Sequence, residues 1–516
     1  MIEQYLIGFS KKTLLLFFLV FHSLFAFPQV NGFYSEIKDP TGKTWRVGDV
    51  LETDNGFLFS LRDQSSSMME SKVVRMSKEG VLLNEKYLSA TDTTINLCSL
   101  FSCSDDNACL VGLGVCTLPD DNALLLTLCL DDELNELNRS LAPLPASDSA
   151  GYWLDDYRFL QTIDGYFALL CYQGSPTEKE IKLCKVSNEG LVTQVERMED
   201  SLVFYVANLF HVHDNPDGFG VFLHKRQIPG THVNTCTIVY DSNLQLNRIC
   251  DVSNWYEDDG HGNIYDGHLS LYNSMMLPSP DGGYYISSRL YELALTGTTA
   301  VHDQSSVMAK TDADFHTQPQ YSIIGHLNDT VEVPSFYKSI DVNDEGVVYQ
   351  CSMQNIIFGS SWPYGSNGTH LVVTKADKDL NVLWQKCFLK DGNVYSAFQT
   401  IATSDGGYLI IGNVYDHNPE RSQDVFIMKI NADGNVGVDE IQEENMAFVY
   451  PNPTKGLLRI GGVEAKETKI YNTLGQCVMS FQGNEANVES LAEGVYLLRI
   501  KDGQGRNQIL RLVVDK

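Results

Sequence analysis

Histidine and aspartate residues in two stretches of the chain have side chains that could bind a metal ion. His211 and His213 alternate along an expected strand and therefore face the same side, and Asp214 follows them. A second group lies in a glycine-containing loop with Asp258, Asp259, His261, Asp266 and His268. Their spacing matches neither a calcium-binding EF-hand loop nor a zinc signature. We therefore favour solvated polar residues, and we predict no metal site and no cofactor.

Catalytic motifs are also missing. The stretch from Asp39 to Trp45 (DPTGKTW) resembles the Asp-box of sialidases, but it has one residue too many between Asp39 and Gly42, and it occurs once. A sialidase also needs grouped arginines for the carboxylate of its substrate, and the sequence shows no such group. Nucleophile-elbow, Walker, HExxH and Rossmann patterns are absent. No catalytic residue is predicted.

Three aromatic residues mark a candidate ligand loop. Phe358, Trp362 and Tyr364 lie in the stretch from Ile356 to Thr369, which interrupts a repeated strand pattern. A second long loop is predicted from Arg289 to Gln304. Loops on a rigid scaffold often carry recognition, and aromatic side chains stack on sugars or anchor protein partners. The alternative is that these aromatic residues pack against their own repeat.

The long middle part of the chain repeats one pattern: a strand, an Asp-Gly or Asn-Gly type of turn, another strand, a variable loop, and two further strands. The seven turn signals are Asn55-Gly56, Asp106-Asn107, Asp164-Gly165, Asp217-Gly218, Asp281-Gly282, Glu345-Gly346 and Asp405-Gly406. A single four-stranded unit cannot bury both of its faces, whereas a ring of units can. We therefore predict an all-β fold with a β-propeller of about seven blades over residues 33–437. Six or eight blades, or two stacked sandwiches, are the alternatives.

Two copies of this pattern carry a resemblance to known repeats. Gly282-Gly283-Tyr284 and Gly406-Gly407-Tyr408 resemble kelch repeats. The longer phrase DGGYLIIG, followed by FIMKINADGNV, resembles the propeller repeats of secreted proteins of the Bacteroidetes. The resemblance implies the propeller fold and says little about activity.

The N-terminal residues predict export. Lys11 and Lys12 precede an apolar run from Leu14 to Phe21, which is too short to span a bilayer. This pattern is typical of a signal peptide, and we predict one over residues 1–26 with cleavage after Ala26. No second apolar stretch of membrane-spanning length follows, so no transmembrane segment is expected in the mature chain.

The C-terminal residues form a separate pattern. An acidic linker is predicted at 438–445, and a small β-sandwich at 446–516. The motif residues are Tyr450, Pro451, Asn452, Pro453, Gly456, Tyr471, Asn472, Gly475, Gln476, Gly494 and Tyr496. This set resembles the type A C-terminal sorting domain of the type IX secretion system. The resemblance implies the type IX secretion machinery and its sortase as partners. It also implies transport across an outer membrane, removal of the domain, and release of the protein or its attachment to surface lipopolysaccharide.

Composition narrows the function further. Of 516 residues, 43% are hydrophobic and 20% charged, as in a folded protein, and the net charge of −29 disfavours nucleic acid and anionic lipid as partners. The twelve cysteines contain no CxxC, and either hairpin disulfides or buried thiols would suit them. We expect a secreted or surface-attached binding protein with an unidentified glycan or protein ligand. The alternatives are a secreted hydrolase with its active site at the propeller channel, and a stalk that binds nothing.

Overall fold

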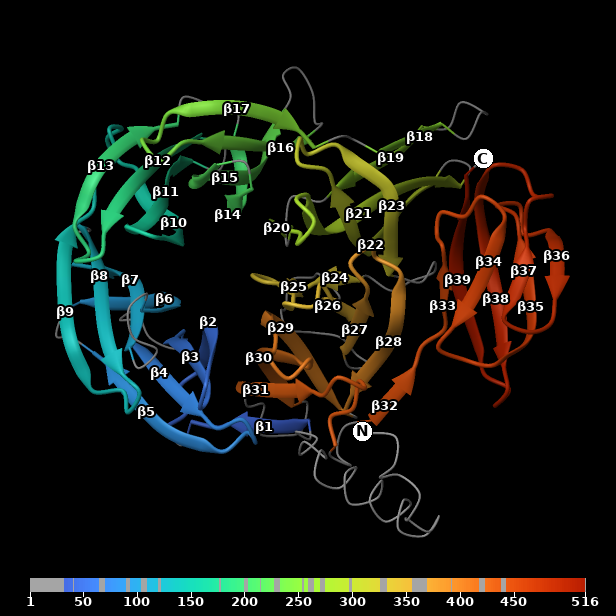
Figure 1. Ribbon diagram of the computed structural model, residues 1–516, viewed down its shortest axis with the longest axis horizontal. Coiled ribbons are helices and arrows are strands. Elements are labelled where there is room, and N and C mark those ends of the chain that lie inside the picture. The colour runs from blue at the N-terminus through green and yellow to red at the C-terminus, as the bar shows by residue number, and fades with distance from the viewer. Residues whose placement is uncertain are drawn as a thin grey trace, which may run out of the picture.

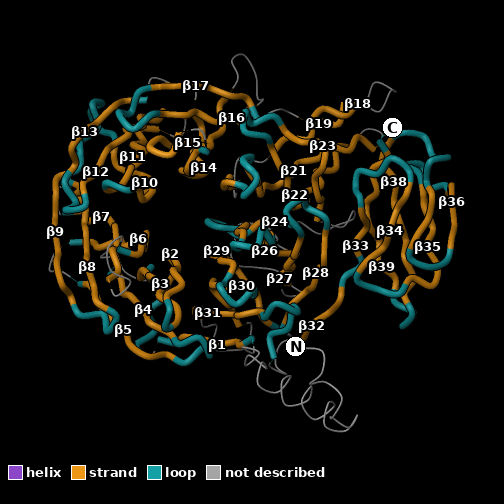
Figure 2. The backbone as a smooth tube through the Cα atoms, viewed as in Figure 1, coloured by secondary structure: helices purple, strands orange, loops and turns teal. Residues whose placement is uncertain are grey.

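The computed structural model describes most of the chain between residues 32 and 515. The described residues are 32–39, 41–64, 70–89, 93–103, 109–118, 122–175, 178–198, 203–213, 215–226, 233–252, 255–258, 264–269, 274–296, 299–324, 332–354, 369–390, 392–416, 423–437 and 442–515. Every regular element in these ranges is a β-strand (Figure 2). None of these ranges holds a helix with the length and hydropathy of a membrane span. The predicted signal peptide lies outside them.

Seven antiparallel sheets of the described chain stand around a common axis, so the predicted all-β propeller is confirmed (Figure 1). The strands of blades 1 to 4, innermost first, are β2 (Trp45–Thr53), β3 (Gly56–Asp63), β4 (Ser71–Met76) and β5 (Leu82–Leu88); β6 (Thr94–Ser102), β7 (Cys109–Thr117), β8 (Ala123–Asp131) and β9 (Glu136–Pro143); β10 (Trp153–Thr162), β11 (Gly165–Ser175), β12 (Glu178–Ser187) and β13 (Val192–Arg197); β14 (Val203–Val212), β15 (Asn215–Arg226), β16 (Val233–Tyr240) and β17 (Leu246–Asp251).

Blades 5 and 6 contain additional strands. Blade 5 contains β20 (Met275–Pro278), β21 (Tyr284–Thr296), β22 (Thr299–Thr311) and β23 (Thr317–Ile324), with β18 (Trp255–Asp258) and β19 (Ile264–Leu269) added beside β21. Blade 6 contains β24 (Val333–Pro334), β25 (Ile340–Val342), β26 (Val348–Gln354), β27 (His370–Ala376) and β28 (Val382–Leu389). Its outer edge is extended by β32 (Gln442–Asn445), so part of the predicted linker is a paired strand.

The ring is closed by the first described strand. Blade 7 consists of β29 (Asn393–Ala402), β30 (Tyr408–Asp416) and β31 (Gln423–Ile430), and its outermost strand is β1 (Phe33–Ile37). The strand β1 pairs antiparallel with β31, from Phe33 opposite Lys429 to Ile37 opposite Val425. Residues from both ends of the propeller therefore share one sheet.

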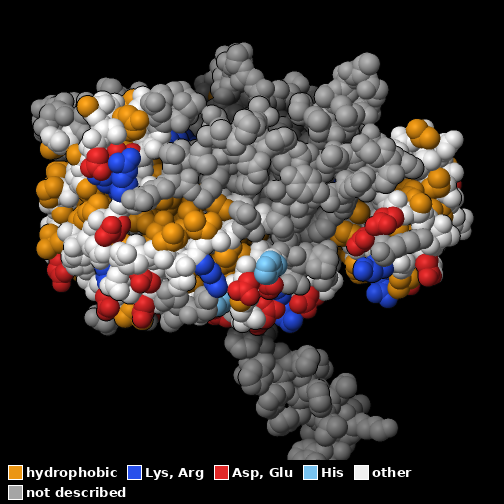
Figure 3. All heavy atoms as spheres, turned by 90° about the horizontal axis from the view of Figure 1, so that it is seen from above, with side chains coloured by type: hydrophobic (Ala, Val, Ile, Leu, Met, Phe, Trp, Pro, Cys, Tyr) orange, Lys and Arg blue, Asp and Glu red, His pale blue; other side chains and the backbone are white. Residues whose placement is uncertain are grey.

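Clusters of buried apolar side chains fill the space between neighbouring blades. Leu58 of blade 1 and Leu126 of blade 2 belong to one such cluster. The cluster between blades 7 and 1 contains Phe33, Phe57 and Leu409. Each blade buries both of its faces because it has a neighbour on each side, which is the reason for a closed ring. Figure 3 shows that the outside of the molecule also carries hydrophobic side chains between the charged ones.

Most of the predicted turn signals lie where they were expected. Five of them join the first and second strands of blades 1, 3, 5, 6 and 7. Asp106-Asn107 lies outside the described residues. Asp217-Gly218 is inside β15, because the chain already reverses between Val212 and Asn215 and the pairing is irregular there. The predicted turn of blade 4 therefore lies a few residues too late in the sequence.

The Asp-Gly-Gly-Tyr sequence of blade 7 shows why this motif recurs. Gly406 has a φ of 78°, which L-residues rarely adopt, and a Cβ on Gly407 would lie 2.4 Å from the carbonyl oxygen of Ile430. Tyr408 is completely buried. Asp405 is held by the buried Lys429, with 2.7 Å between its Oδ2 and the lysine Nζ. Each position of the motif thus has its own structural requirement.

A five-residue turn follows the third strand of the blades. In blade 6, the Oδ1 of Asp377 accepts hydrogen bonds from the N–H groups of Asp379 and Asn381, both at 2.9 Å. The turns that begin at Asp131, Asp241, Asp312 and Asn431 have the same two bonds. Serine hydroxyls accept in blades 1 and 3.

The fourth residue of this turn has a positive φ, and two kinds of residue occupy it. Blades 2, 4, 5 and 6 use Leu134, Leu244, Phe315 and Leu380, with φ values of 60–66° and at most 4% exposure. Each of these side chains belongs to the core that its blade shares with the preceding blade.

Blades 1, 3 and 7 use glycine at the same position. A side chain of the preceding blade then occupies the space where a Cβ would stand. Phe33 lies beside Gly80, Thr127 beside Gly190, and Lys386 beside Gly434. The gap between blades is therefore filled from one side or from the other.

The prediction of a loop from Arg289 to Gln304 was wrong. These residues extend β21 and β22 into one hairpin, with pairing from Tyr284 opposite Thr311 to Thr296 opposite Thr299. The register is continuous over all of these pairs. The shorter strands expected for a repeat of this kind had suggested an earlier end.

Cysteines serve both of the purposes that the sequence left open. Cys103 is disulfide-bonded, whereas Cys171, Cys184 and Cys351 are buried thiols. Cys171 is opposite Ile181 and Cys184 opposite Ala168, so these two hairpin neighbours are not bonded to each other. Burial raises the pKa of each buried thiol to about 12, which keeps it protonated and unreactive.

The C-terminal residues form two further sheets, as predicted for a small sandwich. One contains β33 (Phe448–Tyr450), β34 (Leu457–Gly461) and β37 (Glu485–Asn487). The other contains β36 (Cys477–Phe481), β35 (Ala465–Tyr471), β38 (Gly494–Asp502) and β39 (Asn507–Val514). Leu458, Ile470, Leu498 and Leu512 form a core between them with no exposed surface.

Candidate functional site

The Tyr-Pro-Asn-Pro motif fixes the start of the C-terminal sandwich to its last strand. The Oδ1 of Asn452 accepts a hydrogen bond from the N–H of Val513 at 2.8 Å, and its Nδ2 donates to the carbonyl of Arg511 at 3.1 Å. The backbone of Thr454 pairs with Val513 and Asp515. The four motif residues, Tyr450, Pro451, Asn452 and Pro453, thus join the end of β33 to the end of the sandwich.

The other motif residues shape turns and the second sheet. Tyr471 ends β35, and the Oδ1 of Asn472 accepts hydrogen bonds from the N–H groups of Leu474 and Gln476. Gly475 has a φ of 75°. The carbonyl of Gly456 accepts a hydrogen bond from Val488, Gly494 begins β38, and the hydroxyl of Tyr496 donates to the carbonyl of Ala492 at 2.8 Å. These contacts give the motif residues a structural role in the frame of the sandwich.

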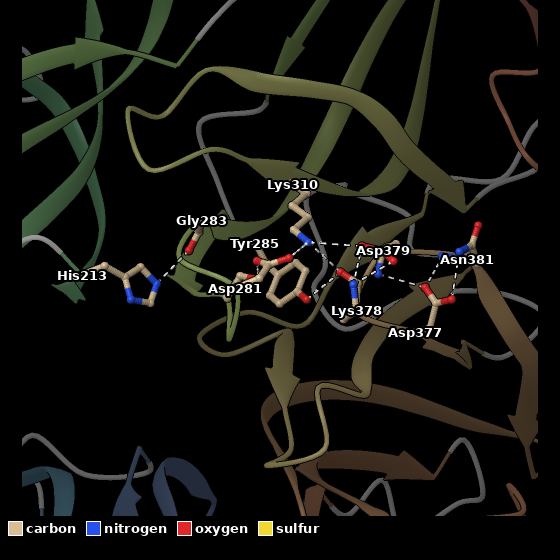
Figure 4. Close-up of polar contacts among 10 residues, drawn as sticks. His213, Asp281, Gly283, Tyr285, Lys310, Asp377, Lys378, Asp379 and Asn381 are labelled. Atoms are coloured by element: carbon tan, nitrogen blue, oxygen red, sulfur yellow. Dashed lines mark hydrogen bonds and ion pairs between the residues drawn. The ribbon is translucent and has the colours of Figure 1, made fainter.

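The end of the ring that carries the turns between first and second strands, called the turn face, holds neighbouring blades together (Figure 4). Lys310 of blade 5 forms an ion pair with Asp281 and donates to the carbonyl of Lys378 in blade 6 at 3.0 Å. The Nε2 of His213 lies 3.0 Å from the carbonyl oxygen of Gly283. His213 therefore contributes to a contact between blades 4 and 5.

The sequence group of histidines and aspartates is not assembled into a metal site within the described residues. Burial lowers the pKa of His211, so its imidazole is neutral at pH 7. Asp214, Asp259 and His261 lie outside the described residues, and so do the side chains of Asp258, Asp266 and His268.

The opposite end of the ring, called the variable face, carries the connections between second and third strands. These connections differ in length, from Ser175 to Glu178 in blade 3 to Gln354 to His370 in blade 6. The predicted ligand residues Phe358, Trp362 and Tyr364 belong to the blade 6 connection and lie outside the described residues.

Asp39 stabilises the turn before β2. Its Oδ2 accepts a hydrogen bond from the Nε1 of Trp45 at 2.6 Å. Burial opposes its ionisation, but this bond and those from Thr41 prevail and lower the pKa of Asp39 to about 2. Asp39 also lines a pocket of about 410 Å³ between β1 and blade 1, in which Lys72 and Glu85 pair at 3.0 Å. The carboxylate has a structural role in this turn.

Two arginines form a group that the sequence did not reveal. Arg46 of β2 and Arg62 of β3 are direct cross-strand partners. The guanidinium of Arg46 lies 4.7 Å from the ring centroid of Phe398 and 5.2 Å from that of Tyr337. The Nη2 of Arg62 donates to the Tyr337 hydroxyl at 2.9 Å. No carboxylate among the described residues forms an ion pair with either arginine.

The backbone around Tyr337 is fixed to blade 7. The N–H groups of Tyr337 and Lys338 both donate to the carbonyl of Phe398 at 3.0 Å. Phe398 lies in a bulge of β29, and the next residue, Gln399, donates from its Nε2 to the carbonyl of Gly48 at 2.6 Å. Gly48 lies in a matching bulge of β2. Blades 1 and 7 therefore hold the arginine pair and its aromatic neighbours in one arrangement.

A family comparison identifies the C-terminal sandwich. Residues 448–515 match the family described as secretion system C-terminal sorting domain. Proteins with this domain are exported by type IX secretion, so the chain is secreted or attached to the cell surface. The secretion machinery is therefore one of its partners.

Comparisons with solved structures concern the fold alone. Drosophila Semaphorin 2a is 8% identical, with coverage of 94% of this chain and 98% of that chain and a TM-score of 0.45. A neuraminidase-like protein of subtype N11 from A/flat-faced bat/Peru/033/2010 is 8% identical, with 78% and 94% coverage and a TM-score of 0.33. The extracellular domain of a hybrid two component system from B. thetaiotaomicron is 9% identical, with a TM-score of 0.37; 94% of this chain is covered, but only 58% of that chain. No curated protein matches the chain.

Proposed function

We propose that the propeller is a binding module without enzymatic activity, which the sorting domain delivers to the cell surface or the medium. In this proposal, the signal peptide is removed after Ala26, and the sortase of the secretion system removes the sorting domain. The ligand is a glycan or a protein, and it contacts the variable face.

The contrast between the two faces of the ring carries this proposal. The turn face is built from short turns with repeated hydrogen bonds, such as those of Asp377, and from ion pairs such as Lys310 with Asp281. The connections between second and third strands lie at the opposite face and differ widely in length. Insertions in repeat proteins map to loops on one face, which is often the binding face.

Shortening residues 356–369 to a tight turn tests the proposal. We expect thermal unfolding to change little and binding to a glycan or host-protein array to be lost. Asn188→Ala, which alters an exposed residue of the turn face, is the matched control and should bind normally. Undiminished binding by the shortened chain would remove this loop from the site. Hydrolysis of glycosides or peptides by the purified chain would favour the hydrolase alternative.

A further inference from the structure

We propose that Arg46 and Arg62 bind a carboxylate group of the ligand at the axial end of the variable face. This inference rests on the proposed binding function and names the chemistry of its ligand. Both residues stand at the ends of their strands that point to this face, since β2 begins and β3 ends there.

The arginine pair is unfavourable for the protein without a ligand. Like charges directly opposite each other on neighbouring strands are destabilising. Burial lowers the pKa of Arg46, Tyr337 opposes this change, and the charge of Arg62 lowers the pKa further. The Nε atoms of both arginines are buried and have no hydrogen-bond partner in the described structure. A bound anion would supply the missing acceptors and the missing negative charge.

A nearby carboxyl group does not fill this role. Asp49 is buried in the bulge of β2, where its Oδ2 accepts a hydrogen bond from the N–H of Leu100 at 3.0 Å and its Oδ1 one from Val50 at 2.8 Å. Both of its oxygens are therefore engaged by the backbone. Burial raises its pKa to about 6, so this carboxyl group is less readily charged than an ordinary aspartate. The arginines thus retain their positive charge without an ion-pair partner, in a chain whose net charge is −29.

The position of the pair is axial. Arg62 lies close enough to influence Cys98 of blade 2 and Tyr157 of blade 3, and it opposes the burial that raises both of their pKa values. Tyr337, from the segment between β24 and β25 of blade 6, bonds to the same arginine. Groups from blades on several sides of the ring therefore converge near Arg62.

A carboxylate fits these groups better than a neutral ligand. Two planar guanidinium groups can each donate paired hydrogen bonds to carboxylate oxygens, and such charge-assisted bonds are stronger than neutral ones. The ring of Phe398 near Arg46 and the Tyr337 hydroxyl at Arg62 restrict the side chains before binding. Less side-chain freedom then remains to be lost on binding.

Glucuronate and N-acetylglycine are suitable probes, because they present a carboxylate on a sugar and on a peptide-like group. Thermal unfolding of the purified secreted chain should shift upward with at least one of them at constant ionic strength, and the responding probe indicates the source of the carboxylate. Neutral glucose should give no such shift. Absence of a shift with both carboxylates would overturn the proposal.

Arg62→Met should weaken carboxylate binding by about tenfold or more, while unfolding without ligand occurs at the same or a higher temperature because the repulsion is relieved. Arg62→Lys keeps the charge and should bind with intermediate affinity. Arg75→Met is the control, because Arg75 pairs with the exposed Glu133 at 2.7 Å. Normal carboxylate binding by Arg62→Met, or by Arg62→Lys if the first variant does not fold, would contradict the site. Loss of array binding on shortening 356–369, with the carboxylate shift intact, would separate the loop from the arginine site.

Discussion

Blades 2, 4, 5 and 6 differ from blades 1, 3 and 7 at one position of one turn. The first group inserts a leucine or phenylalanine with positive φ into the core shared with the preceding blade. The second group has glycine there and receives a side chain from that blade, such as Phe33 beside Gly80. The difference shows that the space between blades must be filled, whereas the blade that fills it can change.

The largest expected effect is that of Phe315→Ala. Phe315 is fully buried and stacks on Tyr284 with 4.6 Å between ring centroids. Its truncation should lower the free energy of unfolding by about 3–5 kcal/mol, because a cavity opens between blades 4 and 5. Urea unfolding of the purified chain measures this change. Leu137→Ala, at an exposed position of β9, should change stability by less than about 0.5 kcal/mol. Similar losses in both variants would contradict the comparison.

Gly80→Leu should be the next most disruptive substitution, at about 2–5 kcal/mol. The new Cβ would lie 2.3 Å from the ring of Phe33, and leucine is strained at a φ of 83°. Combining it with Phe33→Ala should recover part of the loss, since the leucine could then occupy the vacated space. Urea unfolding of the two single variants and the double variant measures the coupling. Simple additivity would show that the two blade types do not fill equivalent spaces.

The smallest expected effect concerns the first residue of the turn. Burial opposes ionisation of Asp312, but hydrogen bonds from His316 and Asp314 prevail and lower its pKa. The stabilising contribution is present above the ordinary aspartate pKa of about 3.9, and it is lost as the pH falls through the lower pKa of the folded state. Asp312→Asn copies Asn431 of blade 7 and should make unfolding slightly less sensitive to pH between about 5 and 2. Urea unfolding at a series of pH values measures this dependence. An unchanged acid dependence would be the contrary result.

The repeat could be predicted from sequence because its signals are local. Asp-Gly and Asn-Gly turns with apolar flanks led to the ring and its number of blades, and the sorting motif led to the sandwich. The hairpin from Tyr284 to Thr311 was missed because its two strands are longer than in the other blades. The pairing of β1 with β31 joins distant residues, and no local pattern indicates it.

The arginine pair was missed for a different reason. From the turn at Asn55-Gly56, regular pairing would place Arg46 opposite Asp63, which would have suggested an ion pair. The bulge between Val47 and Val50 moves the register by one residue, so that Arg46 is opposite Arg62. A bulge depends on contacts with neighbouring blades, here between Gln399 and Gly48, and is not visible in an isolated hairpin pattern.

The strand β1 also determines the order in which the propeller can be completed. It is made first on the ribosome, yet its partner β31 is made almost last, and Phe33 on β1 fills the space at Gly80. A nascent chain that ends before residue 423 therefore has an open ring, an incomplete last blade and an unfilled space at the first. The entropy of closing a long loop grows only slowly with its length, so this arrangement affects the rate of folding more than the final stability. The first blade is consequently not finished until the last one is.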